Sequence, residues 1–201
     1  MSNSKTKVEQ LTVTAILSAI VIIVSFLPLK TMGLEISFAM VPVAVGAILY
    51  GPSVGAVLGG VFGIVSFLQC FGYSAFGTLI LGENFLLTML VCIPTRILAG
   101  LLTGLIFKGI HSFKNKTIKE LSYPISSLIA PLMNTILFMG TLVLCFFKGK
   151  TLQDFAEALG TFNPLLFIIL FVGINGLVEI IAGFVVAYPV SRTLTKHIKK
   201  I

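Results

Sequence analysis

Residues 84–108 read NFLLTMLVCIPTRILAGLLTGLIFK, an apolar run whose interior carries one charged side chain, Arg96. About 20 apolar residues are enough for a helix to cross the hydrocarbon core of a bilayer. Because lipid offers no hydrogen-bond partners, the backbone of such a run must satisfy itself as an α-helix. The stretch therefore predicts a transmembrane helix and places the chain among membrane proteins.

The composition of the whole chain supports this class. Of its 201 residues, 57% are hydrophobic and 10% are charged, whereas about 25% of the residues of an ordinary soluble domain are charged. So few polar side chains cannot cover a soluble core of this size. We expect an all-α membrane protein in which residues 1–201 form a single membrane-embedded domain.

The remaining hydrophobic residues fall into further apolar segments separated by turn-rich or polar connections. With the first stretch they predict six transmembrane helices, at residues 8–28, 34–50, 53–71, 84–108, 124–147 and 163–191. The second segment is short and contains Pro42, so its helix either starts before Ile36 or is broken. Glycines recur every four residues from Gly51 to Gly63 in the third segment, which favours close packing against another helix.

Basic residues distinguish the two sides of the membrane. An even number of spans puts both termini on one side, together with ten basic residues, whereas the opposite side holds three. Because Lys and Arg are enriched in cytoplasmic loops, both termini are predicted to be cytoplasmic. The ten are Lys5, Lys7, Lys108, Lys114, Lys116, Lys119, Arg192, Lys196, Lys199 and Lys200.

A few polar residues lie deep within the predicted spans, where a charged side chain costs about 2.5–3.5 kcal/mol on insertion scales. Counted from the external ends of their helices, Arg96, Asn134 and Asn175 lie at one depth, and Glu179 follows Asn175 by one turn. Two interpretations remain open. The residues form either a polar clasp, in which Arg96 pairs with Glu179, or a pocket for a small solute.

External residues add weaker signals. Gln69 and Asn84, at helix ends, either extend such a pocket or cap their helices in water. Residues 151–160 have apolar side chains at helical spacing and end in glycine. They predict a short amphipathic helix, either a lid over the pocket or an interfacial connector.

Several kinds of chemistry lack their motifs. The sequence has no phosphate-binding G-x-x-x-x-G-K-[ST] loop, no H-E-x-x-H zinc motif and no G-x-S-x-G nucleophile elbow. We therefore expect no enzyme activity, no ATP hydrolysis by this chain, no metal and no cofactor. The basic residues bracket apolar runs instead of forming a solvated face, so we expect no nucleic-acid partner.

The first segment carries small residues, centred on Ala15 and Ala19, which let a second backbone approach. Further features are the six spans, the Gly51-Pro52 start of the third segment and the stretches 38–52, 93–100 and 172–179. Together with the alanine pair, they make the chain resemble the substrate-binding S components of energy-coupling factor (ECF) vitamin transporters. The resemblance covers nearly the whole chain.

The resemblance implies a multi-pass protein of the bacterial plasma membrane that binds a vitamin from outside, with a membrane coupling subunit and two cytoplasmic ATPases as partners. Ala15 and Ala19 match the family motif for docking to the coupling subunit. Among these components, the pantothenate-type ones have the most similar helix sequences. Arg96 suits a small carboxylate as ligand. If Glu179 neutralises Arg96, riboflavin or another vitamin becomes the better candidate. A membrane assembly protein and a stand-alone carrier or channel remain as alternatives.

Overall fold

The computed structural model describes the backbone of residues 2–27, 30–31, 34–35 and 38–198, and the side chains of residues 7–27, 38–173 and 176–196. Within these ranges the chain is almost entirely helical. Two strands of two residues each pair antiparallel, with Lys30 opposite Glu35. The elements are α1 (Ser2–Ser25), β1 (Lys30–Thr31), β2 (Leu34–Glu35), α2 (Met40–Tyr50), α3 (Pro52–Gln69), α4 (Ala75–Glu83), α5 (Phe85–His111), α6 (Lys116–Phe146), α7 (Lys150–Ala158), α8 (Pro164–Ala182), the π-helical turn η1 (Gly183–Ala187) and α9 (Tyr188–Ile198).

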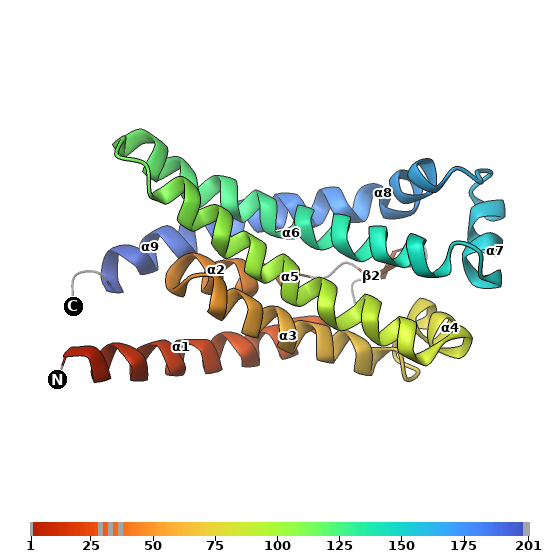
Figure 1. The fold of residues 1–201 in the computed structure, drawn as a ribbon, viewed down its shortest axis with the longest axis horizontal. Helices are drawn as coiled ribbons and strands as arrows, with labels where there is room; N and C mark the ends of the chain where they lie inside the picture. Colours follow the sequence, from red (N-terminus) through yellow and green to blue (C-terminus); the bar gives the residue numbers. More distant parts are fainter. Residues whose placement is uncertain (1, 28–29, 32–33, 36–37, 199–201) are drawn as a thin grey trace.

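The long helices run lengthwise through an elongated bundle (Figure 1), with α3 packed against α1 and α5, and α5 packed against α6. The described chain starts and finishes at the same end of this bundle, whereas α4 and α7 lie at the opposite end, which we call the cap end. Termini at a common end are what an even number of crossings predicts. That this end faces the cytoplasm stays a prediction from the basic residues.

Five candidate spans are found among the described residues, where six were predicted. Five stretches of the described residues are long and apolar enough to cross a membrane: Lys7–Ser25, Pro52–Gln69, Phe85–His111, Lys116–Phe146 and Gly176–Lys196. The helix described within the predicted span 34–50 is α2, with 11 residues, which would reach about 17 Å at 1.5 Å per residue. This helix is enclosed by the bundle, with eight of its residues buried, so it does not need to match the thickness of the lipid.

Two expectations for the second segment were wrong in detail. Its helix starts at Met40, not before Ile36. Pro42 does not break it, because Pro42 lies in the first turn, where a backbone N–H has no acceptor within the helix. The break occurs instead in the last predicted span, where α8 is kinked at Gly173, with φ of 43° and ψ of −130°. Such a positive φ favours glycine, since a Cβ would be strained there.

Two predicted connections contain more helix than expected. The segment 72–82 was predicted as a turn-rich connection, but it holds most of α4, whose first turn is capped by the Ser74 side chain, 3.2 Å from the Gly77 nitrogen. The connection 108–122 is also shorter, because α6 begins at Lys116 after an Asn115 cap. In both cases the capping side chain accepts a hydrogen bond from a first-turn N–H that has no acceptor within the helix, which allows the helix to begin there.

The glycines of α3 lie directly against α5. A Cβ on Gly55 would collide with the Gly100 carbonyl oxygen, and one on Gly59 would collide with the carbonyl oxygen of Arg96. On Gly63 it would lie 2.9 Å from the Cα of Ile93. The predicted close packing is therefore confirmed, and it fixes the position of the α5 segment that carries Arg96.

Candidate binding site

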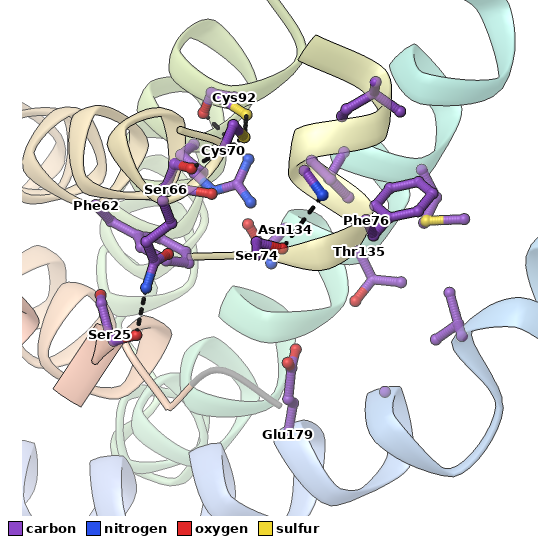
Figure 2. A pocket seen from close by; sticks show the side chains of 18 of the residues that line it. Ser25, Phe62, Ser66, Cys70, Ser74, Phe76, Cys92, Asn134, Thr135 and Glu179 are labelled. Carbon is purple, nitrogen blue, oxygen red and sulfur yellow. Dashed lines mark hydrogen bonds between the residues drawn. The ribbon is translucent and has the colours of Figure 1, made fainter. Parts of the chain in front are cut away.

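A cavity opens among the helices toward the cap end, and Figure 2 shows its wall at close range. Side chains from α1, α3, α4, α5, α6 and α8 line it. Its volume is about 130 Å³. A void that just holds one water molecule is far smaller, about 10–15 Å³ of occupied volume. The space therefore suits a small organic solute.

Arg96 is the charged centre of the wall, with only 6% of its surface exposed. One terminal nitrogen donates to the backbone oxygens of Cys92, at 3.1 Å, and Val91, at 3.4 Å. The guanidinium also lies over two aromatic rings, 4.8 Å from the centroid of Phe62 and 4.4 Å from that of Phe138. Such rings stabilise a cation without neutralising it. The site thus presents a buried positive charge that rests on aromatic rings.

Two buried atoms of this wall have no hydrogen-bond partner among the described residues: the Arg96 Nε, a donor, and the Asn134 Oδ1, an acceptor. Asn134 is 8% exposed. Leaving a buried polar group without a partner costs about 1–3 kcal/mol. The wall of one cavity thus holds a buried donor and a buried acceptor without described partners.

Glu179 lines the same cavity, projecting from α8 on the side away from Cys70 and Cys92 (Figure 2). The clasp interpretation pairs it with Arg96. The described hydrogen bonds of Arg96 go instead to carbonyl oxygens of its own helix, and its planar group rests on rings. Arg96 and Glu179 thus lie in the wall of one cavity, and whether they pair with each other or with a solute stays a prediction.

The other predicted site residues have different places. Gln69 lines the cavity, and its side-chain nitrogen donates to the Ser25 oxygen at 2.6 Å, which ties α3 to α1. Asn84 is not among the lining residues; its Oδ1 accepts from the Leu87 nitrogen at 3.0 Å and caps α5. An exposed cap needs no cavity, because it satisfies a helix N-terminus in water. Asn175 belongs to α8, but its side chain lies outside the described residues.

Sequence reasoning missed part of the wall. Phe62 and Phe138 contact the Arg96 guanidinium with their rings, and Ser66 and Thr135 add hydroxyl groups. Ser66 was detectable, since it lies about one turn from Gln69 on the same face of an apolar helix. The two phenylalanines were not, because the chain has 17 of them and most packing positions accept the ring.

Comparison with known proteins agrees with this geometry. Residues 9–191 match the family described as "ECF transporter, substrate-specific component". The chain belongs to this family. It is also 28% identical to the protein named pantothenate transporter PanT of Leuconostoc mesenteroides subsp. mesenteroides, over 203 aligned positions that cover 96% of this chain and 95% of that protein.

As an ECF S component, the protein is a multi-pass protein of the bacterial cell membrane with a role in transport, and its family is not an enzyme class. Membership implies a vitamin as substrate and a membrane-embedded ECF module as partner.

The predicted docking residues of this S component face outward. Ala15 and Ala19 are exposed on α1, whereas Leu17 and Val21 are buried on its other face. The first helix is the least enclosed of the candidate spans, because only 11% of its apolar 18-residue stretch is buried. A face of small side chains that is not covered by the chain itself is available to another helix.

The S component has two short helices at its cap end, α4 and α7. The predicted helix at 151–160 is confirmed as α7, and Phe155 from α7 packs on Phe76 of α4 at 5.6 Å between ring centroids. Glu83, the last residue of α4, accepts a hydrogen bond from the Thr151 nitrogen at 2.6 Å. Gly149, the residue before α7, has no side chain to cap the helix. The Glu83 carboxylate therefore caps α7 from 68 residues away.

Glu83→Ala is expected to loosen α7. Loss of a helix cap costs about 1 kcal/mol, so the amides of the first turn of α7 should exchange with deuterium several-fold faster, while those of α5 keep their protection. The matched control is Glu157→Ala, which removes an exposed carboxylate of α7 itself. Equal exchange in the two variants would show that Glu83 does not hold this helix.

Proposed function

We propose that the protein is the high-affinity pantothenate-binding S component of an ECF importer. The observation that carries this proposal is the buried Arg96, whose Nε has no described partner, in the wall of a cavity that also contains the acceptor Asn134 Oδ1. Pantothenate offers a carboxylate for the guanidinium, together with hydroxyl and amide donors for Asn134, Gln69 and Glu179. The PanT similarity favours the same vitamin.

A thermal-shift experiment on the purified protein in detergent tests the substrate. Pantothenate at about 100 times its Kd should stabilise the folded state by roughly 2.7 kcal/mol. Panthenol, which carries an alcohol in place of the carboxylate, is the matched ligand control and should stabilise much less. Riboflavin and other water-soluble vitamins complete the screen. A shift with riboflavin but not with pantothenate would reassign the substrate, and no shift with any vitamin would favour an assembly protein.

We further propose that a membrane coupling subunit docks on the outward face of α1 and that two cytoplasmic ATPases supply the energy. The missing phosphate loop and the exposed Ala15 and Ala19 support this division of labour. The S component then captures the vitamin outside and releases it inward only in complex with the module.

Replacing both Ala15 and Ala19 with Phe is expected to abolish vitamin uptake by cells or vesicles that contain the module, because bulky rings keep the two backbones apart. The pantothenate thermal shift should be unchanged, since neither residue lines the cavity. Ile16→Phe, on an adjacent exposed face of α1, is the control. Normal uptake by the double variant would exclude this docking face, and uptake without the ATPases would indicate a stand-alone carrier.

A further inference from the structure

Two cysteine thiols meet in the wall of the cavity. The Sγ atoms of Cys70, which follows the last residue of α3, and Cys92, on α5, lie 4.0 Å apart (Figure 2). Both residues line the cavity, with exposed fractions of 3% and 2%. The Cys70 thiol also lies 3.3 Å from the Ser66 carbonyl oxygen, to which it donates. A reagent that enters the cavity therefore encounters two sulfurs at once.

The two thiols lie where α3 packs on α5. Gly63 lies on α3 about two turns before Cys70, and a Cβ there would lie 3.0 Å from the Cys92 carbonyl oxygen. With no side chain at Gly63, the backbone of α3 approaches closely to the part of α5 that carries Cys92. Cys70 lies about two turns further along, at the end of α3, and its thiol meets Cys92 there.

The third cysteine provides a comparison. Cys145 lies on α6, is half-buried and is not among the residues that line the cavity. It has a thiol of the same chemistry without a neighbouring sulfur at 4.0 Å. Any reactivity specific to the pair must therefore distinguish Cys70 and Cys92 from Cys145.

We propose that Cys70 and Cys92 are a redox-active dithiol, which a small two-electron oxidant in the cavity converts into a disulfide between α3 and α5. Two S–H bonds break and one S–S bond forms, while two electrons and two protons pass to the oxidant. When the oxidant is the azo compound diamide, the two electrons and two protons reduce its N=N bond to a hydrazine.

The disulfide also lowers the affinity for the ligand. A disulfide has an S–S distance of about 2.05 Å, so the sulfurs must approach each other by roughly 2 Å. The Cys92 carbonyl accepts a hydrogen bond from Arg96, so a movement of Cys92 displaces the guanidinium. By linkage, a ligand that binds the reduced form better also opposes oxidation. This consequence rests on the proposed function, whereas disulfide formation does not.

Thiol counting on the full-length Cys145→Ser protein tests the dithiol. After treatment with diamide and then denaturation, neither of the two remaining cysteines should react with a maleimide reagent, and the chain should remain monomeric. A reductant should restore the reaction of both thiols with maleimide. Cys70→Ser and Cys92→Ser, each made in the Cys145→Ser background, should form no intramolecular disulfide. Retention of both thiols by the Cys145→Ser protein, or disulfides only between chains, would overturn the proposal.

The same protein then tests the link to the ligand. Saturating pantothenate should slow the loss of thiols several-fold, and the oxidised protein should bind pantothenate several-fold more weakly. Equal oxidation rates with and without a vitamin that demonstrably binds would overturn the link. If no thermal shift by pantothenate is observed, the substrate assignment fails, but the thiol count still decides whether the dithiol exists.

Discussion

Arg96→Ala should raise the Kd for pantothenate at least about 30-fold. Truncating one partner of a buried, hydrogen-bonded charge pair costs about 2–5 kcal/mol, and each 1.4 kcal/mol is tenfold in Kd. Arg96→Lys should recover little of the loss. An ammonium has no planar fork for a carboxylate, and it does not stack on Phe62 and Phe138 as a guanidinium does. Isothermal titration of the purified variants measures the effect.

Two controls separate a role in binding from a role in folding. Arg192→Ala removes an arginine whose partner is Glu120, at 2.8 Å, and which does not line the cavity; its pantothenate affinity should be unchanged. Panthenol lacks the carboxylate, so Arg96→Ala should weaken panthenol binding far less than pantothenate binding. Equal losses for the two ligands would mean that Arg96 does not bind the carboxylate.

The shared depth of the polar residues was predictable because membrane helices have a fixed rise per residue and start near a common level. Counting inward from the helix ends selected Arg96, Asn134 and Asn175, with Glu179 one turn further in. The structure brings Arg96, Asn134 and Glu179 to one cavity, whereas the Asn175 side chain lies outside the described residues. Their partners in the described structure were not predictable. The orientation of Arg96 toward its own carbonyls and two rings depends on helix rotation and packing, which residue spacing leaves open.

Asn84 is a candidate whose role the sequence left open. A polar residue at the start of an apolar run is compatible with a cap and with a pocket, and only the surrounding fold decides between them. Here Asn84 caps α5. The helix α4 was missed for a related reason. Glycines at both ends of the segment 72–82 favoured a turn-rich connection, whereas Ser74 caps a helix there.

Neighbouring glycines of α3 should respond to the same substitution in opposite ways. Gly59→Ala is expected to destabilise the protein by about 1–3 kcal/mol, because its Cβ would meet the Arg96 carbonyl oxygen, a backbone atom that cannot rotate away. Gly60→Ala places its Cβ 3.5 Å from the Ile97 Cγ1, an ordinary contact. It also gains up to about 1 kcal/mol of helix propensity, so this variant should be as stable as the parent or more stable.

The variants Gly59→Ala and Gly60→Ala also test whether helix packing affects ligand binding. Since the atom that Gly59→Ala would displace belongs to Arg96, we expect that variant to bind pantothenate several-fold more weakly even at temperatures where it is folded, whereas Gly60→Ala should keep the parental Kd. Thermal unfolding and titration of both variants in the same detergent measure the two effects. Equal stability of the two variants would contradict the close packing of α3 on α5. A destabilised Gly59→Ala with parental affinity would show that this contact supports the fold without positioning the guanidinium.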